Sequence, residues 1–92
     1  MIIVCGNLRA WPGRRQELLD LSHLAVVAAR NTEGCIDFAV SPDLVDPDRV
    51  NILERWTTAA ALQAFREDGP GEDISALVQQ FDIEEYEVGA PR

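Results

Sequence analysis

The chain has 92 residues and a formal net charge of −8 at pH 7, from 16 Asp and Glu residues against eight Arg. This length predicts one domain with a small core, because a chain this short buries roughly 60–65% of its unfolded surface. The acidic surplus repels phosphate backbones and anionic lipid, so we expect no nucleic-acid and no membrane partner. The sequence contains no lysine, which excludes a Schiff-base lysine and a P-loop.

The N-terminal segment MIIVCGNLRA has no basic region, and its apolar run is too short for a signal or transmembrane segment. We therefore expect a soluble, cytoplasmic protein. Cys5 and Cys35 each lie in an apolar, strand-like run. This setting favours two unpaired cysteines that pack as small hydrophobic residues over a disulfide.

The first predicted element is a β-strand over residues 2–9, because β-branched residues dominate it. Alternation places on one face Ile3, Cys5 and Asn7, and on the other Ile2, Val4, Gly6 and Leu8. A turn at 11–13 then leads into a segment with helical spacing over 14–30. The apolar stripe predicted for this helix comprises Leu18, Leu21, Leu24, Ala25 and Ala28.

Two alternating segments, 35–41 and 49–57, flank a loop rich in proline and aspartate and are predicted to pair as a hairpin. Thr57 or Thr58 can cap a second helix over 59–67. A short further helix is expected within 71–80, and a last strand over 81–88.

This order predicts an α+β, ferredoxin-like split βαβ fold (βαββαβ), with a four-stranded antiparallel sheet and both helices on one face. We expect the uncovered face to carry aliphatic residues such as Ile2, Val4 and Leu8. An exposed apolar face of that size needs a partner, so the prediction is a homodimer that pairs two sheets face to face.

Several short motifs, in order, resemble the antibiotic biosynthesis monooxygenase (ABM) domains. They are a PG-R turn at 12–14, EGC at 33–35, DPD at 46–48, ERW at 54–56 and AL at 61–62, and the resemblance covers roughly residues 2–88. It implies a single ABM-like domain over 1–92 that forms a dimeric α/β barrel. Members include cofactor-independent oxygenases of quinols and polyketide anthrones, and other branches degrade haem or have no known reaction.

Asn7 and Trp56 are the candidate catalytic residues. An indole can stack on a planar substrate and donate a hydrogen bond, and an amide can donate to a developing oxyanion. The two would enter one pocket if both share the helix-facing side, and the resemblance implies an asparagine and a tryptophan at these places. The alternatives are that Trp56 fills space under the second helix and that Asn7 is a satisfied core or edge amide.

Phe38, Phe65 and Tyr86 are predicted to line the substrate site, with Tyr86 also able to shuttle a proton. Glu54 is the candidate base if burial raises its pKa, although a salt bridge is the alternative. His23, the single histidine, is predicted to face solvent. Asp43, Asp46 and Asp48 are read as a solvated turn, because the spacing lacks the glycine and distal glutamate of a calcium loop.

The quinol-oxidising members carry histidines in a pattern like AL..H....HF, whereas this chain has ALQAFREDGPGED, with Phe65 at the first of those places. The missing ligand argues against haem. We expect no cofactor, so that the electrons come from the substrate. The predicted function is a cofactor-independent monooxygenase that oxidises a small aromatic substrate, a quinol or an anthrone, with O₂. The alternatives are a non-catalytic ligand-binding or interaction module, and a cofactor-free isomerase or cyclase on the same barrel.

Overall fold

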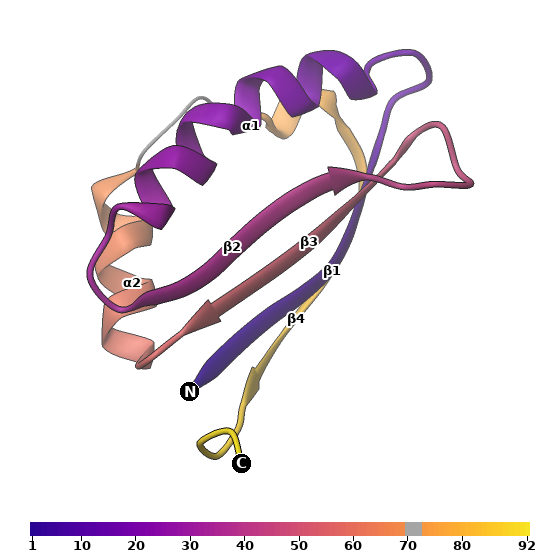
Figure 1. Cartoon of the computed structure of the whole chain (residues 1–92). Helices are drawn as coiled ribbons and strands as arrows, with labels where there is room; N and C mark the ends of the chain where they lie inside the picture. The colour runs from indigo at the N-terminus through magenta and orange to yellow at the C-terminus, as the bar shows by residue number, and fades with distance from the viewer. Residues whose placement is uncertain (70–72) are drawn as a thin grey trace.

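The computed structural model describes residues 1–69 and 73–92. Its elements confirm the βαββαβ order, with one short 3₁₀ helix, η1, before the last strand (Figure 1). Their bounds are β1 Ile2–Ala10, α1 Arg15–Arg30, β2 Cys35–Pro42, β3 Arg49–Trp56, α2 Ala59–Asp68, η1 Ser75–Leu77 and β4 Val78–Glu87. The helix predicted within 71–80 is reduced to η1 in its described part, and residues 71 and 72 lie outside the described residues.

The four strands form one antiparallel sheet in the order β2-β3-β1-β4, so β2 and β4 are its edges. Both helices pack on the same face of this sheet (Figure 1). One part of the core lies between β1, β3 and the helices at Ala29 and Leu62, and the other lies under Leu18 and η1. Neither described helix is long and apolar enough to cross a bilayer.

The second helix follows the local rules for helix ends. Thr58 adopts an extended backbone, and its side chain accepts a hydrogen bond from the Ala61 N–H at 3.1 Å. Gly69 ends α2 in the left-handed conformation, with φ of 58°. The N-cap predicted at Thr57 or Thr58 is therefore confirmed at Thr58.

The apolar stripe predicted for α1 is partly wrong. The residues of α1 that are buried are Leu18 and Ala29, whereas Leu24 is 58% exposed. Six residues separate Leu18 from Leu24, which turns the helix by about 240°. Once Leu18 docks on the sheet, Leu24 therefore faces away from it.

The helices cover the opposite face of β1 from the one that we expected. Ile2, Val4 and Leu8 are 9%, 2% and 2% exposed, and they pack in the core instead of on the uncovered face. Alternation along a strand separates its two faces but does not say which one the helices cover. The prediction that these aliphatic residues lie on the bare face is wrong.

The uncovered side, called the outer face below, carries the other set of side chains from each strand. Two residues that pair across antiparallel strands lie on the same face of the sheet. Leu53 therefore lies on the same face as its partner Cys5, and Tyr86 on the same face as its partner Ile3. Leu53 and Tyr86 are 40% and 51% exposed. The outer face comprises Ile3, Cys5, Asn7, Arg9, Asp37, Ala39, Ser41, Arg49, Asn51, Leu53, Arg55, Gln80, Asp82, Glu84 and Tyr86.

Gly6 allows β1 and β4 to approach each other closely in the middle of the sheet. Its φ is +148°, and a Cβ added there would lie 2.0 Å from the carbonyl oxygen of Asp82. A backbone oxygen cannot swing away as a flexible side chain can. This strand position therefore requires glycine.

Candidate functional site

Three aromatic side chains meet on the helix-facing side of the sheet beneath α2. The ring centroids of Trp56 and Phe65 are 5.2 Å apart, and those of Phe38 and Phe65 are 5.8 Å apart with an edge-on geometry. Trp56 is fully buried. With Glu54, these residues form what we call the Trp56 cluster. Phe38 and Phe65, two of the residues predicted to line the substrate site, belong to it.

Glu54 is the acidic member of the Trp56 cluster. It lies two residues before Trp56 on β3, so both side chains point to the same face, and Oε1 accepts a hydrogen bond from the indole Nε1 at 3.0 Å. Burial raises the pKa of Glu54; the Trp56 hydrogen bond and the Arg66 charge oppose this shift, and the Glu85 charge adds to it. A half-buried carboxylate with a raised pKa is better matched to proton abstraction near neutral pH than an exposed one.

An ion pair between α2 and β4 lies next to Glu54 and was not foreseen from the sequence. The Nη2 atom of Arg66 lies 2.5 Å from Oε1 of Glu85, and the two side chains are 44% and 50% exposed. Glu85 shares the helix-facing side because Val4, its register partner, also pairs with Glu54 on the other strand. The contact depends on the register of β4 and on the docking of α2, because Arg66 and Glu85 are 19 positions apart along the chain.

Cys35 is the register partner of Trp56 and lies near the same cluster. Burial and the charge of Glu54 raise the pKa of its thiol, which opposes formation of a thiolate. Cys35 and Cys5 are both free and half-buried. The prediction that they do not pair is confirmed.

Asn7 and Tyr86 do not join the Trp56 cluster. Asn7 pairs with Asn51, and Tyr86 pairs with Ile3, so both lie on the outer face. Trp56 pairs with Ile2, five residues before Asn7, and an odd separation along a strand reverses the face. The condition for a shared pocket of Asn7 and Trp56 is therefore not met within one chain.

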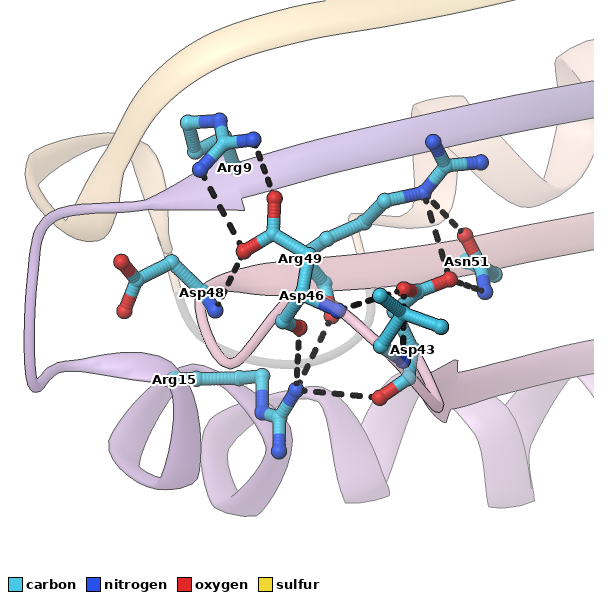
Figure 2. Close-up of polar contacts among 8 residues, drawn as sticks. Arg9, Arg15, Asp43, Asp46, Asp48, Arg49 and Asn51 are labelled. Atoms are coloured by element: carbon cyan, nitrogen blue, oxygen red, sulfur yellow. Dashed lines mark hydrogen bonds and ion pairs between the residues drawn. The ribbon is translucent and has the colours of Figure 1, made fainter.

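The aspartate-rich β2–β3 hairpin is held together by hydrogen bonds (Figure 2). The Asp43 carboxylate accepts from the backbone N–H of Asp46 at 2.8 Å and of Val45 at 3.1 Å, and from Asn51 at 2.9 Å. These bonds, the one from Asp46 first, lower the pKa of Asp43 to about 2. The folded turn thus favours the ionised form of Asp43.

Arginines surround the same hairpin. Arg9 pairs with the Asp46 carboxylate, Arg49 approaches Asp43 at 3.5 Å, and Arg15 donates from α1 to backbone carbonyls of the loop, at 2.9 Å for Asp46 (Figure 2). Across residues 1–69 and 73–92, no group of three or more His, Cys, Asp or Glu side chains is placed to hold a metal ion. The aspartates serve the turn, as predicted.

Among residues 1–69 and 73–92, neither of two prominent surface hollows is lined by Trp56 or Glu54. One of about 320 Å³ lies along residues 73–75 and 78–81, and one of about 350 Å³ lies between α1 and β2. His23 is exposed, as predicted, and it lies on the rim of the second hollow. The Trp56 cluster itself is packed as part of the core.

The fold defines the chain first as a ferredoxin-like α+β domain of the split βαβ type. The family model described as "Antibiotic biosynthesis monooxygenase" matches residues 1–73. The chain therefore belongs to the antibiotic biosynthesis monooxygenase family, as the motif resemblance implied.

Solved structures with this fold come from several bacteria. A candidate antibiotic biosynthesis monooxygenase from Deinococcus radiodurans is 25% identical, with a TM-score of 0.80 over 100% of this chain and 96% of that one. A second such candidate, from Chloroflexus aurantiacus, is also 25% identical, with a TM-score of 0.74 over 99% and 96%. PA3566 from Pseudomonas aeruginosa, 22% identical with a TM-score of 0.79 over 97% and 94%, shares the fold.

Among curated proteins, the chain is similar to the uncharacterized protein sll1783 of Synechocystis sp. The two are 30% identical over 61 residues, which is 66% of this chain and 42% of that protein. The match thus spans about two fifths of the relative's length.

Proposed function

We propose that this ABM domain is a cofactor-independent monooxygenase that oxidises a small aromatic substrate, a quinol or an anthrone, with O₂. The observation that carries the proposal is the hydrogen-bonded pair of Glu54 and Trp56 beside Phe38 and Phe65, in a chain of this family. An acid with a raised pKa and an aromatic surface are what an electron-rich phenolic substrate needs for activation.

The reaction balances without an external reductant. Glu54 removes a proton from the CH₂ carbon of an anthrone, and the resulting enolate adds to O₂ to form a peroxide anion. Protonated Glu54 returns the proton to the peroxide, which then loses water as the carbon becomes a carbonyl. One oxygen atom of O₂ thus enters the product and the other leaves as water.

Trp56 has two roles in this proposal. Its N–H holds the Glu54 carboxylate in place before proton transfer. Once Glu54 is protonated, the same N–H is available to the developing oxyanion. Because Trp56 is fully buried, the substrate approaches Glu54 from the side of α2 and β4, past the half-exposed pair of Arg66 and Glu85.

The proposed active unit is a homodimer that buries the outer face of each sheet. The centre of that face is apolar, and it carries the partly exposed side chains of Leu53, Ile3 and Tyr86. Exposed apolar surface on a sheet favours association with a matching surface. We assign Asn7 and Tyr86 to this interface, where they would line a site formed by both subunits and not the Trp56 cluster of one chain.

Oxygen consumption tests the proposal directly. Metal-free protein is mixed with a panel of hydroquinones and anthrones, beside the variants Glu54→Gln and Trp56→Phe. We expect O₂ uptake above autoxidation that both variants reduce at least tenfold, on the order of the loss of a positioned base. Trp11→Phe, at an exposed tryptophan, is the matched control and should retain the wild-type rate. Uptake that is equal in all four proteins would remove the Trp56 cluster from the reaction.

A second candidate function is a non-catalytic ligand-binding or interaction module. The complete burial of Trp56 favours it, as does Phe65 at the place where quinol-oxidising members carry a histidine. Binding of an aromatic probe without O₂ uptake or chemical change across the same panel would select this module. Conversion of a substrate without O₂ would instead select an isomerase or cyclase.

A further inference from the structure

The hollow of about 350 Å³ between α1 and β2 is an amphipathic cleft at the open edge of the sheet. Its apolar lining comes from the helix-facing side of β2 and from α1. These residues are Leu19, Val26, Val40 and Pro42. The polar lining residues are Ser22, His23 and Arg30. The Ser22 hydroxyl donates to the backbone carbonyl of Leu18 at 2.7 Å, and His23 and Arg30 carry N–H donors on the rim. A hollow of this size lies at the lower end of the range for small-molecule sites.

Arg30 is held in a defined orientation at one end of this cleft. Its Nε donates to the backbone carbonyl of Phe38 at 2.9 Å, which also satisfies an acceptor on an edge strand. With Nε engaged, the two terminal amino groups remain able to bind a carboxylate in a bidentate fashion.

His23 lies on the same side of α1 as Arg30. Arg30 follows His23 by seven positions, which is nearly two helical turns and places the two residues about 10 Å apart along the helix axis. A ligand between them would have its apolar body on Val26 and Val40, with the Arg30 guanidinium at one end and the His23 imidazole at the other.

The charge around this cleft differs from that of the rest of the chain. None of the 16 acidic residues is among its lining residues. Within the described ranges, no carboxylate lies within ion-pair distance of Arg30, whereas the arginines that form ion pairs are Arg9, Arg14, Arg49 and Arg66. In a protein of net charge −8, a guanidinium with no ion-pair partner in the described ranges is a favourable place for an anion.

We propose that the cleft between α1 and β2 binds a small monocarboxylic acid with an apolar body, whose carboxylate pairs with Arg30 and whose far end lies near His23. This site goes beyond the proposed oxygenase and does not depend on it. Val26 and Val40 of its lining pack against the core around Phe38 and Trp56, and Arg30 donates to the Phe38 carbonyl, but no residue of the Trp56 cluster lines the cleft.

The probe for this proposal is benzoate, compared with benzamide, its neutral isostere. Titrations of ¹⁵N-labelled protein followed by NMR should show saturable benzoate shifts at the amides of Val26, Arg30 and Val40, with benzamide binding at least about tenfold more weakly. Arg30→Gln should weaken benzoate binding by a similar factor, because it removes the charge and keeps an N–H donor for Phe38.

Two further variants keep the test decisive if Arg30→Gln does not fold. His23→Asp places a carboxylate on the exposed rim and should also weaken benzoate binding about tenfold. Arg14→Gln makes the same charge change at the start of α1, outside the cleft, and should leave the affinity unchanged. Equal binding of benzamide, shifts confined to other residues, no saturable shift, or an equal loss in Arg14→Gln would each overturn the proposal.

Discussion

The indole Nε1 of Trp56 donates a hydrogen bond to Oε1 of Glu54 at 3.0 Å, between neighbouring side chains on one face of β3. This bond joins a fully buried aromatic ring to a half-buried acid. It accounts for both residues at the end of this strand, since the indole needs an acceptor and the carboxylate needs a donor.

Removing this donor should destabilise the protein. Trp56→Phe keeps an aromatic ring but leaves Glu54 without its hydrogen bond, at an expected loss of about 1–3 kcal/mol in the free energy of unfolding. Urea denaturation at neutral pH measures this loss. The control Trp11→Phe, at a side chain 47% exposed, should change stability by less than about 0.5 kcal/mol. Equal effects of the two substitutions would contradict the role of the bond.

Glu54 should make stability fall as the pH rises. Its folded pKa lies above the ordinary value of 4.5, so the folded state holds this proton more tightly than the unfolded chain. The resulting stabilisation is fully present below pH 4.5 and is lost as the pH rises through the raised pKa. Glu54→Gln should therefore gain stability relative to wild type between about pH 4 and about pH 8. Urea midpoints over that range test this, with the exposed Glu33→Gln as the control for a lost charge.

Gly6→Ala should be among the most harmful small substitutions in the sheet. The new methyl group would collide with the Asp82 carbonyl, so we expect a loss of more than about 2 kcal/mol. Gly13→Ala also occupies a positive φ, of +79°, but meets nothing within 4 Å, and should cost only about 1–2 kcal/mol. Thermal unfolding of both variants separates the collision from the backbone strain. Equal losses would show that β1 and β4 adjust to the methyl group.

The outer face should control the state of association. Wild-type protein is expected to have twice the chain mass of 10.2 kDa in sedimentation equilibrium. Leu53→Glu places a charge in the apolar centre of this face and should shift the equilibrium to monomer. Leu44→Glu makes the same change at the hairpin tip, where the side chain is 99% exposed, and should leave the dimer intact. A monomeric wild-type protein would contradict the proposed dimer.

Asp43 should contribute to the acid sensitivity of the fold. Its pKa is lowered from 3.8 to about 2, so its stabilising contribution is present above pH 3.8 and is lost as the pH falls towards 2. Asp43→Asn should be less stable than wild type near neutral pH, and the difference should shrink through this acid range. Chemical denaturation at a series of pH values measures it. Parallel pH profiles for the two proteins would show that the turn does not depend on an ionised Asp43.

The sequence by itself determined the order of the elements and much of their local structure. The sequence limited the N-cap of α2 to Thr57 or Thr58, because a threonine hydroxyl caps a helix within its own turn, and the structure places the cap at Thr58. Alternation also separated Ile3 and Asn7 from Ile2 and Val4, as the register confirms. These features depend on neighbours only a few residues away, so local pattern is sufficient to predict them.

Only the tertiary structure decided which face of the sheet the helices cover. That choice placed Val4 in the core and Asn7 on the outer face, away from Trp56. It also brought Arg66 to Glu85 and placed His23 on the rim of a cleft. Such contacts depend on how strands distant in the sequence align and on which side the helices dock, and a period of two is the same for either choice.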